Sequence, residues 1–261
     1  MATYVISDIH GKADAFFDLL NQVQFSDADE LYVLGDLIDR GSKSAEIFHW
    51  AVEEAPSNVH FLLGNHEDMA ESVLARVSDE GSIYDMFNYS DIWNYNGGIQ
   101  TLNSLREKYG AKWCRKSAQW IRELPIYYIV EVNGKEWLLI HAGLAHSRRM
   151  SDLFAPVGRD EDIDIPEIDE IWSQHLVWVR DRWLYNSRSY PYDIVFGHTP
   201  TSYWVESFFS QSIAIQGQPG YIVRMVGFDN YKVRYCIDCG YNRLGMLRLD
   251  DCMEFYSQKG V

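Results

Sequence analysis

The chain has 261 residues, enough for one large domain or two small ones, and its hydrophobic content of 47% excludes a disordered protein. Its net charge of −15 excludes a nucleic-acid backbone as the main partner, because that partner requires a basic face. No apolar run approaches the roughly 20 residues of a membrane span, and the first residues lack a signal-peptide pattern. We therefore expect a cytoplasmic protein that binds neither nucleic acid nor membrane.

The first third of the chain repeats one local pattern. Ser42 is the expected N-cap of the second of its three predicted helices. In this order, strand, loop and helix predict parallel strands covered by helices, with ligands at the carboxyl ends of the strands. The strands are predicted at residues 3–6, 30–34 and 59–63, and the helices that follow them at residues 13–23, 42–52 and 67–75.

The middle of the chain predicts helices followed by a β-hairpin. Residues 82–124 have helical character with an interruption at 96–98. The dipeptide Asn133-Gly134 lies between two apolar segments, and this is a strong signal for a two-residue hairpin turn. The second strand of the hairpin runs directly into His141.

The last third predicts one more helix and several strands. We expect a Trp-rich helix near 176–185, a short strand within 193–200 and antiparallel strands over 213–256. The dense acidic run at 159–170 is interpreted as a solvated loop. Because no repeat or low-complexity linker interrupts the chain, we expect residues 1–261 to form a single domain.

Five predicted strands end in side chains that are able to bind a metal ion. A lone His in such a place is usually hydrogen-bonded rather than a ligand, but five such strand ends are not independent accidents. We expect them all at the same edge of one sheet. A set of only His, Asp and Asn suits Mn²⁺, Fe²⁺ or Zn²⁺. The side chains are Asp8, His10, Asp36, Asn65, His141 and His198.

Six ligating side chains exceed the number that one tetrahedral site uses, so the pattern favours two ions. If Asp36 bridges them, Asp8 and His10 complete one site, and the remaining three side chains complete the other. Two ions roughly 3.5–4 Å apart that share a water or hydroxide are the usual device for in-line displacement at phosphorus. Their charge would outweigh that of the two aspartates and attract a phosphate dianion, despite the acidic chain.

Six short motifs occur in an order that resembles one family of enzymes. The segments "SDIHG", "GDLIDRG", "GNHE", "HAG", "FGHT" and "CIDCG" resemble the phosphoprotein phosphatase family of metallophosphoesterases, over residues 3–250. The segments "NYNGGIQTL" and "LVWVRDRW" resemble its bacterial and phage branch. The resemblance implies an α/β (α+β) fold, a four-layer αββα sandwich of mixed sheets with a dinuclear metal site at the carboxyl ends of strands.

The resemblance also implies a role for each matching residue. It assigns the six side chains above to the two metal sites, with manganese expected and iron or zinc as alternatives. His66 matches the general acid that protonates the leaving alkoxide, and Asp39 matches the carboxylate that orients it. Arg40 and Arg180, together with Asn65, match residues that bind the phosphate oxygens. A hydroxide that bridges the two metals is the implied nucleophile, so no side chain needs to attack.

Two activities fit these motifs, and a third reading treats the chain as a binding protein that has kept the fold. The first is a serine/threonine or dual-specificity protein phosphatase that acts on a phosphorylated protein or peptide. The alternative is a symmetrical diadenosine tetraphosphate hydrolase, which shares the fold and the metal ligands. Its subfamily tends to lack the acid before the Arg-Gly of the second motif, so the presence of Asp39 favours the phosphatase. The intact ligands and both arginines argue against a non-catalytic protein, and the pattern makes no prediction of oligomeric state.

Other chemistry-bearing residues receive a structural interpretation. Cys236 and Cys239 form the only Cys-x-x-Cys pair and are interpreted as ordinary thiols of a reduced chain, because no second pair exists. Glu67 is interpreted as a helix-start acid favoured by the helix dipole. Tyr241 and Trp172 are candidates for the border of the substrate site.

Overall fold

The structure, a computed structural model, describes residues 1–80, 91–144, 176–185, 190–210, 213–227 and 233–258. The acidic run at 159–170 and Trp172 lie outside these residues, so the interpretations given to them stay predictions. No helix among the described segments is long and apolar enough to cross a membrane.

The first sheet has five strands in the order β11-β10-β1-β2-β3. Strands β1, β2 and β3, from the first third of the chain, are parallel as predicted. Strand β10 pairs antiparallel with β1, and β11 pairs antiparallel with β10. The strands are β1 (Thr3–Ile6), β2 (Glu30–Val33), β3 (Val59–Phe61), β10 (Gly245–Arg248) and β11 (Met253–Tyr256). The helices that follow the first three strands are α1 (Ala13–Gln22), α2 (Ser44–Glu53) and α3 (Asn65–Leu74).

The second sheet has six strands in the order β4-β5-β6-β9-β8-β7. The predicted hairpin is confirmed: β4 and β5 pair antiparallel around Asn133 and Gly134, whose φ angles of 53° and 73° fit a primed turn. Strands β5, β6 and β9 are parallel to one another, so this sheet is also mixed. Its strands are β4 (Tyr127–Val132), β5 (Lys135–Ile140), β6 (Asp193–Phe196), β7 (Ile213–Gln216), β8 (Val223–Gly227) and β9 (Val233–Cys236).

The two faces of the first sheet bury different cores. Tyr4 and Ile6 of β1 point to the side of α1, α2 and α3, where the largest apolar cluster lies. Val5, between them, points to the opposite side and belongs to a cluster shared with the second sheet. Because successive side chains of a strand alternate between faces, this division means that the sheet is covered on both sides.

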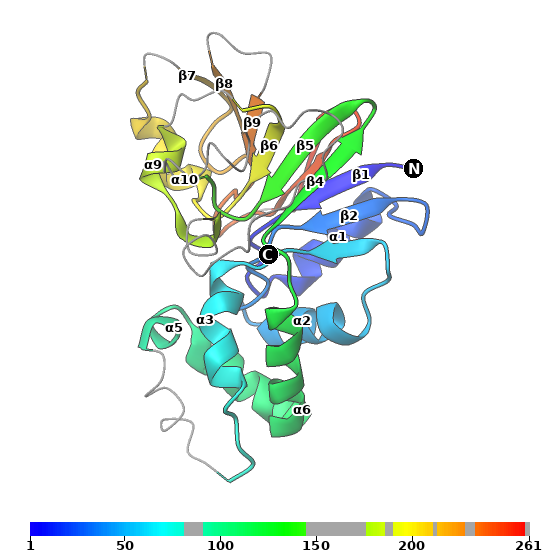
Figure 1. The fold of residues 1–261 in the computed structure, drawn as a ribbon, viewed down its shortest axis with the longest axis vertical. Coiled ribbons are helices and arrows are strands. Elements are labelled where there is room, and N and C mark those ends of the chain that lie inside the picture. The colour runs from blue at the N-terminus through cyan, green and yellow to red at the C-terminus, as the bar shows by residue number, and fades with distance from the viewer. Residues whose placement is uncertain (81–90, 145–175, 186–189, 211–212, 228–232, 259–261) are drawn as a thin grey trace, which may run out of the picture.

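The second sheet divides its side chains in the same way. Leu139 of β5 joins the cluster between the sheets, whereas Leu138 and Ile140 join a third cluster with Trp183 and Trp204. Those tryptophans belong to α9 (Asp181–Leu184) and α10 (Thr201–Trp204), which cover the outer face. Three apolar clusters thus separate four layers, helix, sheet, sheet and helix, and this confirms the expected αββα sandwich (Figure 1).

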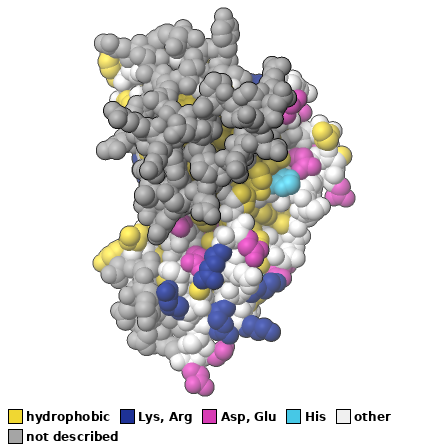
Figure 2. Space-filling model, in the orientation of Figure 1, with side chains coloured by type: hydrophobic (Ala, Val, Ile, Leu, Met, Phe, Trp, Pro, Cys, Tyr) yellow, Lys and Arg dark blue, Asp and Glu magenta, His cyan; other side chains and the backbone are white. Residues whose placement is uncertain are grey.

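Helices α5 (Asp91–Tyr95) and α6 (Gly98–Arg122) extend below the sheets next to α3 (Figure 1). The interruption predicted at 96–98 falls between them, where Gly97 has a φ of 104°. On the face seen in Figure 2, basic and acidic side chains lie interspersed over this part of the molecule. Ion pairs such as Lys116 with Glu53, 2.6 Å apart, are consistent with such a surface.

Two local predictions were wrong. The second helix begins at Ser44 with Lys43 as its N-cap, and neither residue supplies a side-chain cap. The Ser44 hydroxyl instead donates to the Gly41 carbonyl, and the helix begins two residues later than predicted. The Trp-rich helix near 176–185 is broken at residues 179–180, between a helical turn at 176–178 and α9.

Candidate active site

The predicted ligands meet where the two sheets adjoin, rather than at the edge of one sheet as expected. Asp8 and Asp36 follow strands of the first sheet, whereas His141 and His198 follow β5 and β6 of the second. The His141 Nδ1–H donates to the Leu34 carbonyl at 2.6 Å, and the His198 backbone N–H donates to Asp8 Oδ2 at 3.0 Å. These two hydrogen bonds therefore fix the ligands that follow the first sheet relative to the ligands that follow the second sheet.

Backbone strain concentrates at this junction. Among the described residues, nine that are not glycine have a positive φ, a conformation that is costly for a side chain with a Cβ. Strain of this kind persists only where the surrounding structure enforces it, and it marks functional positions. Six of the nine are predicted site residues: Asp8, His10, Asp36, Asp39, Arg40 and His198.

Glycines allow the loops to approach one another. Gly35, directly before Asp36, has a φ of 84°, and a Cβ there would lie 2.4 Å from the Gly64 nitrogen. A Cβ on Gly41 would lie 2.1 Å from the His10 carbonyl oxygen. Any larger residue at these two positions would force the three loops apart, which explains why glycines flank the acidic segment after β2.

Asp36 lies between two groups of imidazoles. Its Oδ2 is 3.5 Å from His10 Nε2 and 3.9 Å from His66 Nε2, and its Oδ1 is 3.5 Å from His141 Nε2. The ligand atoms of His10, Asp36 and His66 form one compact group, and those of Asp36, His141 and His198 form a second. The shared position of Asp36 is the one predicted for a bridging ligand.

The remaining predicted ligands adjoin these groups. Asp8 Oδ1 is 4.0 Å from His10 Nε2, on the side of the first group. Asn65 Oδ1 accepts a hydrogen bond from His198 Nδ1 at 2.8 Å and lies 3.1 Å from His141 Nε2, within the second group. The structure thus brings all six predicted ligands together, and it places His66, predicted as the acid, beside them.

The electrostatics of the cluster fit divalent cations. Burial lowers the pKa of His10 and of His198 well below its usual value, which keeps both imidazoles neutral with a lone pair to offer. Burial and the neighbouring Asp36 carboxylate raise the pKa of Asp8. The Nε2 of His198 is buried and has no hydrogen-bond partner. Neutral imidazoles, crowded carboxylates and an orphaned ring nitrogen are what a pair of divalent ions would satisfy.

His66 and Asp39 form a buried dyad next to the ligand cluster. The His66 Nδ1–H donates to Asp39 Oδ2 at 2.6 Å, and neither side chain is exposed. Asp39 also accepts hydrogen bonds from Trp93 Nε1 at 2.7 Å and from the Thr101 hydroxyl at 2.5 Å. Burial lowers the pKa of His66, but the Asp36 and Asp39 carboxylates outweigh it and raise that pKa above its usual value. Helices α5 and α6 therefore supply residues that hold the dyad in place.

Two exposed arginines line a cleft of 590 Å³ in front of the cluster, together with His10, His198 and Asp238. We call this the main cleft. Arg40 contacts two imidazoles: its Nη1 is 2.8 Å from His10 Nε2, and its Nη2 is 3.0 Å from His66 Nε2. Arg180 donates to the His198 carbonyl at 2.7 Å. Two of the three predicted phosphate-binding residues thus present guanidinium groups to the same space, which Tyr241 also lines.

Sequence reasoning missed the part that Glu67 plays in the site. The side chain is fully buried, and its carboxyl group accepts the backbone N–H groups of Asp36, Leu37 and Ile38 at 2.8, 2.9 and 3.3 Å. Burial raises the pKa of the Glu67 carboxyl to about 8, and the Asp36 carboxylate adds to the effect. Glu67 therefore shapes the loop that presents Asp36, a role that no local sequence signal distinguishes from a helix-start acid.

Similar proteins were found among curated relatives and solved structures. The symmetrical bis(5'-nucleosyl)-tetraphosphatase of Salmonella paratyphi B (strain ATCC BAA-1250 / SPB7) is 40% identical over 145 residues, which are 55% of this chain and 44% of that protein. The protein of the same name from Salmonella paratyphi C (strain RKS4594) is 31% identical over a stretch of the same length. The match thus spans less than half of the length of either relative.

One solved structure, provisionally described as a diadenosine tetraphosphatase, covers 100% of this chain and 95% of its own with a TM-score of 0.55. At 17% identity, this likeness shows the fold alone. A model of the family described as calcineurin-like phosphoesterase matches residues 1–237. This match covers nearly the whole chain, including every one of the predicted site residues. The chain belongs to the calcineurin-like phosphoesterase family, and it is a metallophosphoesterase, a hydrolase of phosphoester bonds.

Proposed function

We propose that the protein is a phosphomonoesterase that dephosphorylates serine and threonine residues of proteins or peptides, with phosphotyrosine as a further substrate. One observation supports this choice most directly, the buried pair of His66 and Asp39 with its 2.6 Å hydrogen bond. An alkoxide such as that of serine is a poor leaving group and needs a proton as the bond to phosphorus breaks. An imidazole held in one tautomer by a carboxylate is suited to supply that proton.

The chain's own residues have distinct parts in this reaction. Arg40 and Arg180 bind the non-bridging phosphate oxygens, for which the planar guanidinium offers two parallel donors. His66 donates its Nε2 proton to the leaving oxygen, and Asp39 stabilises the cationic imidazole before the transfer. Arg40 Nη2 lies 3.0 Å from His66 Nε2, so a phosphate bound by Arg40 would be held next to the proton donor.

Two divalent ions, held by the six ligands around Asp36, would supply an activated water and neutralise the phosphoryl oxygens. The donor set of nitrogen and oxygen atoms favours manganese, with iron or zinc as alternatives.

The test compares leaving groups in the His66→Asn variant. We expect kcat/KM on a phosphoserine peptide to fall by about a hundredfold or more, because general acids contribute roughly 10²–10⁴-fold. The loss on p-nitrophenyl phosphate should be much smaller, because the p-nitrophenolate needs little protonation. Metal content, measured on the same samples, controls for damage to the ligand cluster. Equal losses on both substrates would show that His66 is not the proton donor.

A second candidate is the symmetrical hydrolysis of dinucleoside tetraphosphates, and the 40% identity to relatives of that name favours it. There the leaving group is a nucleotide phosphate, which needs no proton donor, so this activity leaves the dyad unexplained. Steady-state kinetics on phosphoserine and phosphothreonine peptides and on diadenosine tetraphosphate, with Mn²⁺ added, separates the two. A kcat/KM at least about tenfold higher on the dinucleotide would overturn the protein phosphatase proposal.

A further inference from the structure

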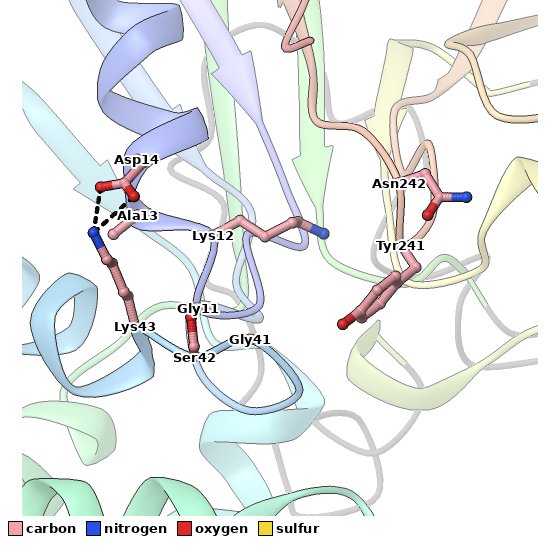
Figure 3. A pocket seen from close by; sticks show the side chains of 9 residues that line it. All are labelled: Gly11, Lys12, Ala13, Asp14, Gly41, Ser42, Lys43, Tyr241 and Asn242. Carbon is pink, nitrogen blue, oxygen red and sulfur yellow. Dashed lines mark hydrogen bonds and ion pairs between the residues drawn. The ribbon is translucent and has the colours of Figure 1, made fainter. Parts of the chain in front are cut away.

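A second hollow lies beside the main cleft. It has a volume of 240 Å³ and is formed by three turns, at residues 11–14, 41–43 and 241–242 (Figure 3). We call it the side pocket. None of the ligand, dyad or phosphate-binding assignments above uses the side chains that line it, so its chemistry requires a separate explanation.

The side pocket and the main cleft are lined by neighbouring residues of the same loops. His10 and Arg40 line the main cleft, whereas the residues that follow them, Gly11 and Gly41, line the side pocket. Tyr241 lines both hollows, and the residue is 65% exposed. A group bound next to Arg40 therefore lies one residue along the backbone from the lining of the side pocket, and Tyr241 borders both hollows.

Lys12 gives the side pocket an available positive charge. Figure 3 shows its side chain extending between the turns toward Tyr241 and Asn242, and its Nζ is 5.9 Å from the Tyr241 ring centroid. The Lys12 side chain has no hydrogen bond or ion pair with any residue that the structure describes. Burial lowers the pKa of Lys12, and the carboxylates of Asp238 and Asp8 act against this effect without forming an ion pair with it.

Lys43, by contrast, is already paired. Its Nζ lies 2.7 Å from the Asp14 carboxylate, which lines the same pocket (Figure 3). Two lysines and one aspartate leave a net charge of +1 on the pocket lining, in a chain whose net charge is −15. The first turns of α1 and α2, which have no side-chain caps, add the partial positive charge of their N–H groups to that of Lys12. The pocket is thus a local site of attraction for an anion.

We propose that the side pocket is a subsite for a second anionic group of the substrate, the carboxylate of an Asp or Glu close to the phosphorylated residue. Lys12 binds this carboxylate, and Tyr241 packs against the chain that connects it to the phosphate. An extended chain advances roughly 3.3–3.6 Å per residue, so the acidic residue lies within about two positions of the phosphoresidue. This inference rests on the proposed function and narrows it to acidic phosphopeptides.

The experiment compares two phosphoserine peptides of equal length, one with Glu on each side of the phosphoserine and one with Ala. The wild-type protein should show a kcat/KM about three- to fivefold higher on the acidic peptide, as expected of a partly exposed charge pair. Lys12→Met should reduce this ratio to about one, and Lys12→Glu should invert it. The ratio cancels any general effect of the substitution on catalysis or folding.

Lys116→Met is the matched control, because Lys116 is a lysine of α6 that pairs with Glu53 and lines neither hollow. It should leave the ratio unchanged. Lys43→Met should reduce the ratio less than Lys12→Met, because the charge of Lys43 is already compensated by Asp14. An acidic-to-neutral ratio that is the same in the wild type and in both Lys12 variants would overturn the proposal.

A separate measurement distinguishes this inference from the proposed function. The two peptides are tested as competitive inhibitors of p-nitrophenyl phosphate hydrolysis, which reports their binding whether or not they are cleaved. Peptides that bind with a Lys12-dependent preference but are not hydrolysed would support the subsite and refute the protein phosphatase. If Lys12→Met instead weakens only diadenosine tetraphosphate hydrolysis, the pocket binds a polyphosphate, and the assignment to an acidic peptide is wrong.

Discussion

The Asp39→Asn substitution removes one negative charge beside His66 while it preserves the shape of the side chain. Asp39 is fully buried and accepts three hydrogen bonds, from His66, Trp93 and Thr101. An Asn with its oxygen in the place of Oδ2 still accepts from the two rings, and the rotatable Thr101 hydroxyl can accept from the new amide. The fold should therefore tolerate the change, and the main loss is that of charge.

The magnitude follows from the bond that loses its charge. A hydrogen bond to a charged group contributes about 1.5–3 kcal/mol, so the cationic form of His66 loses stabilisation of that order. At about 1.4 kcal/mol for each factor of ten, kcat on a phosphoserine peptide should fall by about ten- to a hundredfold. The loss on p-nitrophenyl phosphate should be small, since its leaving group needs little protonation.

The pH dependence gives an independent test of the same reasoning. The carboxylates of Asp36 and Asp39 raise the pKa of His66 against the effect of burial, so removing one of them lowers it. A proton donor is active below its pKa, and the alkaline limb of the kcat profile should therefore move to lower pH in Asp39→Asn. The assay is kcat from pH 5 to 10 on both substrates. An alkaline limb that does not move, or equal losses on both substrates, would refute the role of Asp39.

Three further predictions concern metal content, stability and thiol reactivity. Asp36→Asn should lower the occupancy of both ions, as measured by elemental analysis, because Asp36 belongs to both ligand groups; full occupancy would contradict a bridging role. Burial raises the pKa of Glu67 from 4.5 to about 8, so the folded state binds its proton more tightly than the unfolded state does. Stability of the metal-free protein should therefore decline as pH rises through that interval, and Glu67→Gln should show a flatter dependence in urea titrations. At pH 8 only Cys252 should react quickly with a thiol reagent, because Cys114 is buried with its pKa raised to about 11 and the other two thiols are buried as well; a second fast thiol would contradict this burial.

Much of the site could be predicted from the sequence because its residues follow strands directly. The strands are short apolar segments, and a polar residue after each one, such as Asp8 or His141, stands out locally. The sheet to which each strand belongs could not be predicted in this way. β5 and β6 joined a second sheet because of pairings with β4 and β9, which are contacts that no local pattern encodes. The error about one sheet edge did not affect the ligand set, since the edges of both sheets adjoin.

Glu67 illustrates the opposite case, in which the local pattern is clear and its interpretation was incomplete. An acid in the first turn of a helix is ordinarily explained by the dipole, and Glu67 does lie in the first turn of α3. Its burial depends on a loop some thirty residues earlier in the chain, whose three N–H groups point at it. Gly35 and Gly64 approach each other closely beside this contact, and that approach is a property of the folded structure.

The strained loops and the hydrogen bonds that hold them form one system. A left-handed conformation costs a residue with a Cβ roughly 1–2 kcal/mol, and Asp36, Asp39 and Arg40 adopt it within five positions. Glu67 holds the start of this segment through three backbone hydrogen bonds, and the Trp93 and Thr101 side chains hold its end through Asp39. The bridging ligand Asp36, the orienting carboxylate of Asp39 and the phosphate-binding Arg40 therefore share one backbone segment whose conformation is fixed from both sides. A substitution that releases either end should disturb proton donation, metal binding and phosphate binding together, whereas a change at Lys12 should leave all three in place and alter only the choice of peptide.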